Sequence, residues 1–142
     1  MFLNFTHGIS TIMRHPSIAA LGRVLLALLF LASGLSKLGA AAATKAYIAS
    51  VGLPLPSVIY AIALVVEIGG GLLLLLGLQA RLTATVLAVF TVMAAILFHH
   101  DFADQNQAVH FLKNLAIAGG LLQVTVAGAA RFSLDARRLQ KA

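Results

Sequence analysis

Cysteine is absent from this 142-residue sequence, and charged residues make up only 10% of it. Without cysteine, the chain cannot form a disulfide, carry out thiol redox chemistry, or hold zinc or an iron–sulfur cluster through sulfur ligands. Any redox role therefore needs a bound cofactor or a partner protein. A water-soluble fold of this length could not cover its surface with so few charges, and 61% of the residues are hydrophobic. The composition predicts an integral membrane protein.

Motifs of nucleotide and hydrolytic chemistry are also missing. The sequence has no Walker loop, no dinucleotide fingerprint, no GxSxG motif and no HExxH motif. A polar stretch does carry imidazole and carboxylate groups, but their spacing matches no metal-ligand pattern. These groups belong to His99, His100, Asp101, Asp104 and His110. We therefore expect no metal site.

Acidic residues are scarce: four against ten basic ones, giving a formal net charge of +6. In a soluble protein such an excess would suggest a nucleic-acid partner. Here the basic residues flank apolar runs, where they orient a membrane protein and meet anionic lipid headgroups. They are Arg14, Arg81, Arg131, Arg137, Arg138 and Lys141. The expected partner is thus the lipid bilayer and not nucleic acid.

Four apolar runs are each close to the roughly 20 residues that cross a bilayer as a helix. They cover about residues 17–38, 57–78, 82–98 and 109–129. Because they show no period-two alternation, a transmembrane barrel is excluded. The sequence predicts an all-α, four-helix membrane domain over residues 17–130. Residues 1–16 precede it as an amphipathic or disordered segment, and residues 131–142 follow it as a basic tail.

The positions of the basic residues predict the orientation of the bundle. Arg14, Arg81 and the basic tail would share one side, while Lys37 and Lys45 lie near the other. By the positive-inside rule, both termini are then cytoplasmic, and residues 39–56 and 99–108 face outward. In a bacterium this describes a multi-pass protein of the inner membrane.

Three charged residues lie within or at the ends of the first two predicted spans. Glu67 is near the middle of the second span, where a carboxylate is costly and needs a partner or a proton. We expect Arg23, inside the first span, to be that partner, and Lys37 to extend to the outer interface without a special role. For Glu67, a structural ion pair and a role in binding or proton transfer both stay open.

The fourth span opens with a polar stripe. His110, Lys113 and Asn114 stand at positions i, i+3 and i+4, so they project from one helix face. With Glu67, Arg23 and Lys37 they form the candidate ligand or proton site. The preceding connection, with His99, His100, Asp101 and Asp104, is expected to act as a lid or docking surface over it.

Three segments resemble the DoxX family of small bacterial inner-membrane proteins. They are GRVLLALLFLASGLSKL (22–38), EIGGGLLLLLG (67–77) and DFADQNQAVHFLKNLAIAGGLL (101–122). The resemblance implies a four-helix membrane bundle. The positions that match the family pattern are Arg23, Gly34, Lys37, Glu67, Asp101, His110, Lys113, Asn114, Gly119 and Gly120.

The resemblance also implies a function, because the family takes its name from a similarity to the small subunit of a thiosulfate:quinone oxidoreductase. Some relatives join membrane redox assemblies that handle oxidative stress. Our leading hypothesis is a subunit or accessory of a redox system that holds a quinone-like ligand and works with a redox partner. A non-enzymatic assembly factor or chaperone is the first alternative. A small-molecule or proton-linked transporter, which would need a homo-oligomer, is the second.

Overall fold

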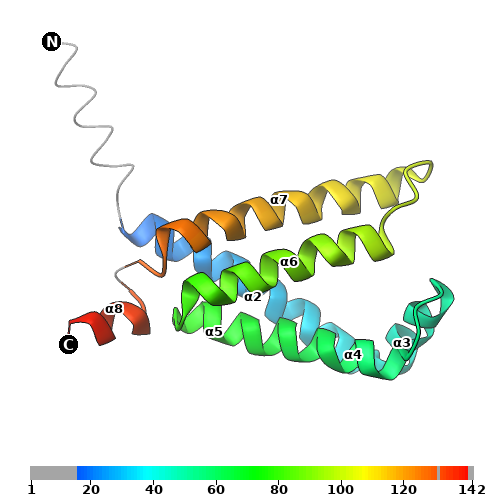
Figure 1. Cartoon of the computed structure of the whole chain (residues 1–142), viewed down its shortest axis with the longest axis horizontal. Helices are drawn as coiled ribbons and strands as arrows, with labels where there is room; N and C mark the ends of the chain where they lie inside the picture. Colours follow the sequence, from blue (N-terminus) through cyan, green and yellow to red (C-terminus); the bar gives the residue numbers. More distant parts are fainter. Residues whose placement is uncertain (1–15, 131, 141–142) are drawn as a thin grey trace, which may run out of the picture.

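The computed structural model describes residues 16–130 and 132–140, and within these ranges the chain is helical and contains no strand. The predicted all-α fold class is confirmed. Residues 1–15, on which the predicted amphipathic segment falls, lie outside the described residues. The elements in chain order are α2 (Pro16–Gly39), α3 (Ala41–Ser50), α4 (Pro56–Leu64), the π-helical segment η1 (Val65–Gly69), α5 (Gly70–Leu76), α6 (Ala80–Phe98), α7 (Gln105–Ala127) and α8 (Leu134–Leu139) (Figure 1).

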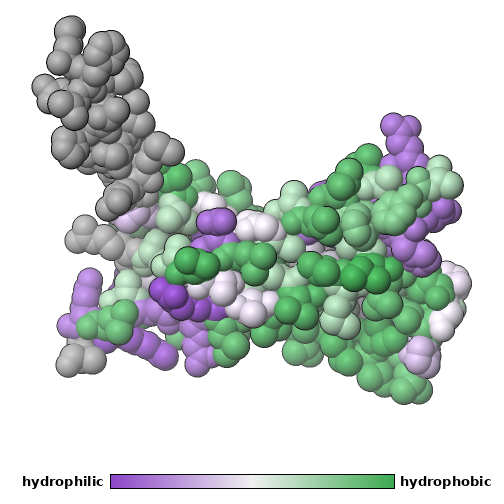
Figure 2. Space-filling model, turned by 45° about the horizontal axis from the view of Figure 1, so that its top comes forward, coloured by the Kyte–Doolittle hydropathy of each residue, from purple (hydrophilic) through white to green (hydrophobic). Residues whose placement is uncertain are grey.

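Four helices are long and apolar enough to span a membrane. They are α2, the continuous helix Pro56–Leu76 formed by α4, η1 and α5, then α6, and finally α7. Their outer faces carry many exposed leucine, isoleucine and valine side chains. In Figure 2 the hydrophilic surface lies mostly at the two ends of the molecule, with hydrophobic surface between them. This distribution suits a protein whose waist is surrounded by lipid.

The fourth helix is longer than its apolar run. Its predicted start was residue 109, but α7 begins at Gln105, because the side chain of Asp104 accepts a hydrogen bond from the backbone N–H of Asn106 at 2.8 Å and caps the first turn. The first turn of α7 is polar, so in the sequence it looks like part of the preceding connection.

Small residues allow the helices to pack closely. On α2 the buried positions Ala20, Arg23, Ala27, Phe30 and Gly34 recur every three or four residues and form one stripe. The fully buried core side chains Leu74, Leu87 and Leu121 come from α5, α6 and α7. At Gly34 the backbone of α2 comes so close to η1 that an added Cβ would lie 2.5 Å from Cγ1 of Ile68. Glycine is required there by space.

Two short helices lie outside the four spans. α3 occupies the predicted outward connection between the first two spans and packs on α4. α8 follows α7 and is held against the turn before α6, since the two carboxylate oxygens of Asp135 accept hydrogen bonds from the backbone N–H groups of Gln79 and Ala80 at 2.8 and 2.9 Å. Gly77 ends α5 with φ of 62° in the same turn, a conformation that favours glycine.

Candidate functional site

A cavity of about 690 Å³ lies inside the half of the bundle nearer α3 and the α6–α7 connection. Its walls come from α2, α3, α4, η1, α6 and α7 and are largely apolar. Four aromatic side chains line it: Phe30, Tyr47, Phe90 and Phe98. Ile62, Met93 and Leu97 line it as well and are also exposed on the apolar outer surface, so the cavity reaches the side of the molecule that lipid covers.

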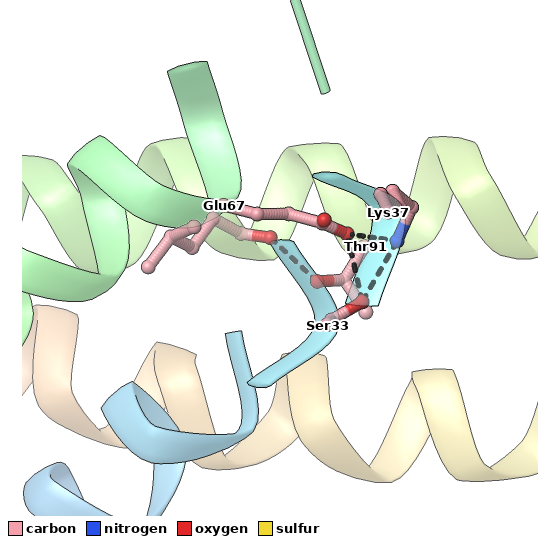
Figure 3. Close-up of polar contacts among 5 residues, drawn as sticks. Ser33, Lys37, Glu67 and Thr91 are labelled. Atoms are coloured by element: carbon pink, nitrogen blue, oxygen red, sulfur yellow. Dashed lines mark hydrogen bonds and ion pairs between the residues drawn. The ribbon is translucent and has the colours of Figure 1, made fainter. Parts of the chain in front are cut away.

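A buried carboxylate forms the polar centre of this cavity. The Nζ atom of Lys37 lies 2.9 Å from Oε1 of Glu67 and 2.8 Å from Oγ of Ser33, and Ser33 donates in turn to the same Oε1 at 3.2 Å (Figure 3). Glu67 is only 5% exposed. Its second oxygen, Oε2, has no hydrogen-bond partner within the described part of the chain. A buried carboxylate oxygen without a hydrogen-bond donor costs free energy, so a ligand that donates to Oε2 would be stabilised here.

The π-helical segment sets the position of this carboxylate. Glu67 is the third of the five residues of η1, between α4 and α5. A π turn holds one more residue than an α turn and is found frequently at functional sites. Because Gly34 lets η1 approach α2 closely, the Glu67 side chain meets the Ser33 and Lys37 side chains one turn apart on α2.

Thr91 of α6 completes the polar wall beside the ion pair, as Figure 3 shows. Its hydroxyl donates to the carbonyl oxygen of Leu87 at 2.7 Å, and its side chain lines the cavity. The donor capacity of this hydroxyl is therefore used within α6. Its oxygen can still accept a hydrogen bond.

A second polar group lines the cavity from α7 and the connection before it. Nζ of Lys113 lies 2.9 Å from Nδ1 of His110, whose ring stacks on that of His99 with centroids 5.0 Å apart. Nδ1 of His99 is 2.8 Å from Oε1 of Gln107. His99, His110, Lys113 and Asn114 all line the cavity. The predicted stripe on α7 thus shares one cavity with Glu67 and Lys37.

Arg23 does not belong to this group, and the expected pairing of Arg23 with Glu67 is wrong. Arg23 is buried at the opposite end of α2, where its guanidinium donates to the carbonyl oxygens of Ala129 and Phe132, the second at 2.6 Å. Arg23 and Lys37 are fourteen positions apart, which corresponds to about 21 Å along a helix. Arg23 holds the segment that links α7 to α8.

The expectation that Lys37 would only extend to the interface is also wrong. Side chains of a helix lean toward its N-terminus, so Lys37 reaches back along α2 to Ser33 and Glu67. Tyr60 of α4 donates to the backbone carbonyl of Lys37 at 3.2 Å, which fixes the end of α2 against the second span. Lys37, and not Arg23, is therefore the partner of Glu67.

The acidic residues of the α6–α7 connection hold its backbone. Asp101 accepts from the N–H of Ala103 at 3.1 Å and Asp104 caps α7, while His100 is exposed, and none of the three lines the cavity. No group of three or more histidine, aspartate or glutamate side chains in the described ranges is placed to hold a metal ion. His99 is the one loop candidate that faces the cavity.

Sequence reasoning missed Thr91, Gln107 and the aromatic lining. Threonine is common where membrane helices pack against each other, and phenylalanine in an apolar run is typical of a hydrophobic core. Neither residue type indicates a ligand site by itself. One signal was available, since Glu67 is followed by three consecutive glycines, an unusual weakening of a helix beside a buried charge. That pattern could have indicated an irregular helix at Glu67.

The chain was compared with known proteins. The sequence model of the DoxX family matches residues 18–100. The chain is 39% identical over 116 residues to the inner membrane protein YqjF of Escherichia coli, covering 80% of this chain and 85% of YqjF. It is 32% identical over 127 residues to the inner membrane protein YphA of the same organism, covering 86% of this chain and 91% of YphA. No solved structure shows a significant match. With four membrane-spanning helices and a family match over more than half its length, the chain belongs to the DoxX family and is a multi-pass protein of the inner membrane.

Proposed function

We propose that this protein is a ligand-binding subunit or accessory of a membrane redox system, and that its ligand is a quinone-like ring held in the cavity beside Glu67. The observation that carries the proposal is the orphaned Oε2 of Glu67 in a largely apolar cavity of about 690 Å³. Cavities of this size and character hold small organic ligands that are oriented by a few polar groups.

The lining suits an apolar ring with polar substituents. Phe30, Phe90 and Phe98 offer aromatic faces and edges to a planar ligand. Lys37 and Glu67 supply polar groups on one wall, and His110 and Lys113 supply them from α7. Because the cavity reaches the lipid-covered surface, a ligand dissolved in the bilayer has a route into it.

A redox role would lie in the ligand and a partner protein. The chain has no cysteine, so it offers no thiol to carry electrons. A bound quinone supplies two-electron chemistry, and the side chains of this protein would bind it, orient it and keep it in an apolar environment. Whether the protein takes part in the response to oxidative stress would depend on the partner protein that exchanges electrons with the bound quinone.

Ligand binding can be tested with purified protein in detergent. We expect it to retain membrane quinone on extraction and to bind an added alkylated benzoquinone. Ala94 lines the cavity, so Ala94→Phe places an aromatic ring in space that the ligand would occupy. Binding should weaken at least tenfold, which corresponds to about 1.4 kcal/mol. Ala116→Phe makes the same change on the exposed surface of α7 and should leave binding unchanged.

Coupling to electron transfer needs a second measurement. Quinone-dependent electron transfer in membranes that contain this protein should fall when Glu67→Gln or Lys113→Ala is introduced. Protein free of quinone, together with unchanged electron transfer in both variants, would remove the proposal. A partner recovered by gentle detergent extraction, with Glu67→Gln lowering only stability, would support an assembly factor in its place.

A further inference from the structure

The polar wall of the cavity next to Glu67 offers more acceptors than donors. Oε1 of Glu67 already accepts from Lys37 and Ser33, whereas Oε2 has no donor in the described ranges. The Glu67 carboxylate forms an ion pair with the Lys37 ammonium group at 2.9 Å, and a carboxylate accepts hydrogen bonds but donates none. The hydroxyl group of Thr91 already donates its hydrogen to the carbonyl oxygen of Leu87, so towards a ligand it can only accept. A ligand that brings hydrogen-bond donors to this wall would complete it.

Charge also limits the kind of donor that fits. Lys37 and Glu67 form one ion pair, so the two formal charges on this wall cancel. A cationic ligand would gain the attraction of Glu67 but meet the repulsion of Lys37 a few ångströms away. A neutral O–H group, in contrast, can donate to Oε2 without disturbing the pair. The structure therefore favours a neutral hydroxyl over an amine.

We infer that the cavity binds the reduced, hydroxyl-bearing form of the ring more tightly than the oxidised, carbonyl-bearing form. This inference rests on the proposed function and names the form of the ligand that the site takes. In the reduced form, a ring O–H donates to Oε2 of Glu67. In the oxidised form, a carbonyl oxygen would face Oε2 with lone pairs and could not donate to it. Oε2 would then be shielded from water without a hydrogen-bond donor, which costs free energy. The remaining N–H of Lys37 can reach a carbonyl, but it does not relieve Oε2.

Three probes built on the same ring test the inference on the unaltered protein. They are decyl-benzoquinone, its hydroquinone in oxygen-free buffer, and the dimethyl ether of that hydroquinone, which is larger by two methyl groups, carries no donor and resists oxidation to the quinone. We expect the hydroquinone to bind about tenfold more tightly than the quinone, and the dimethyl ether to bind no more tightly than the quinone. Equal binding of the quinone and the hydroquinone, or tighter binding of the quinone, would overturn the inference.

A variant pair locates the selectivity. Glu67→Gln places an amide N–H₂ where the carboxylate stood, so it can donate to a carbonyl, and the preference for hydroquinone should vanish or reverse. Asp101→Asn removes a carboxylate that lies outside the cavity and should keep the preference. A preference that persists at full size in a folded Glu67→Gln variant would assign the selectivity elsewhere and overturn the inference.

Failure of the inference and failure of the proposed function give different results. If none of the three probes binds the unaltered protein, the cavity does not hold quinone-like rings and the proposed function fails. If the probes bind with equal affinity, only the selectivity fails. A tenfold preference for the reduced form would also raise the two-electron reduction potential of the bound ring by about 30 mV, which a redox titration of the bound ligand measures.

Discussion

A buried carboxylate and a partly buried ammonium group stand at the same site, and a buried guanidinium group stands at the other end of the bundle. Glu67 and Lys37 satisfy each other in part, while Arg23 donates to two backbone carbonyl oxygens and keeps its Nε without a partner among the described residues. In an apolar interior each of these groups needs its partner, because an unpaired charge there is far more costly than a paired one. Charged residues thus line the candidate site at one end of the bundle and hold the chain together at the other.

Loss of Lys37 should destabilise the protein more than loss of the pair as a whole. Lys37→Met leaves the Glu67 carboxylate buried without its counter-charge, and we expect the free energy of unfolding to fall by about 3 kcal/mol. The double change Lys37→Met with Glu67→Gln removes both charges and should recover more than half of that loss. Unfolding in mixed micelles under denaturant measures both values.

Lys45→Met provides the control, because Lys45 only lies over the ring of Tyr60 at 5.9 Å. Its effect should stay within about 0.5 kcal/mol, as for other changes away from buried pairs. A Lys37→Met variant as stable as Lys45→Met would show that the ion pair contributes nothing to folding.

The second span is the element that differs most from a regular membrane helix. Its middle is π-helical, and α2 approaches it through Gly34. The contact depends on the absence of a side chain at that glycine. Glu67 therefore takes its position from the fit between two helices and not from its own helix alone.

Gly34→Ala should disturb this fit. The added Cβ would lie 2.5 Å from Cγ1 of Ile68 and 3.3 Å from Cβ of Glu67, so η1 must move away from α2. We expect a loss of about 1–3 kcal/mol in unfolding free energy, as for other overpacked sites, together with weaker ligand binding. Thermal unfolding and a ligand titration check the two effects.

Gly22→Ala is the matched control on the same helix. Nothing lies within 4 Å of a Cβ at Gly22, so the change should be neutral or stabilising by up to about 1 kcal/mol through helix propensity. Equal effects of the two alanine changes would mean that close packing at Gly34 is unimportant.

Asp135 connects α8 to the start of α6. Asp135→Ala removes hydrogen bonds to the N–H groups of Gln79 and Ala80 and should cost about 1–2 kcal/mol, as loss of a helix cap does. Proteolysis within residues 132–140 should become faster in that variant. Arg138→Ala, an exposed change on the same short helix, should leave the cleavage rate unaltered.

The sequence allowed the elements to be predicted only as far as the bilayer dictates them. Apolar run length predicted four spans, because every helix that crosses the hydrocarbon needs about 20 residues. It did not predict η1, since the same residues fit an α or a π turn, and the glycines after Glu67 indicate only that a regular helix is weakened there. α3 was missed for a similar reason: it packs on α4 and leaves little periodic pattern of its own.

The candidate site was predicted in part for a comparable reason. Glu67, His110 and Lys113 stand out because polar groups are rare in these runs. Which partner each of them meets depends on the depth and direction of neighbouring helices, and sequence alone gives neither. Arg23 was therefore given the wrong partner, and Thr91 was overlooked.

For the whole molecule, orientation in the membrane stays a prediction. We expect both termini on the cytoplasmic side, from the basic residues near them. Single cysteines introduced at Ser50 and Gln140 would be the only thiols present, because the sequence has none of its own. In intact cells an impermeant thiol reagent should modify Ser50→Cys but not Gln140→Cys. Modification in the reverse pattern would invert the topology.

The wider turn at Val65–Gly69 also constrains how this chain can change in length. Each residue of an α-helix turns the chain by about 100°. Since a π turn takes up one more residue than an α turn, deleting one residue from this segment would make the second span regular and keep the half that packs on α3 oriented to the half that packs on α6. Substitutions can be absorbed here by small movements of side chains. A deletion would keep both half-helices in place but remove the wide turn that carries Glu67, so the position of this carboxylate depends on the extra residue more than the packing of the span does.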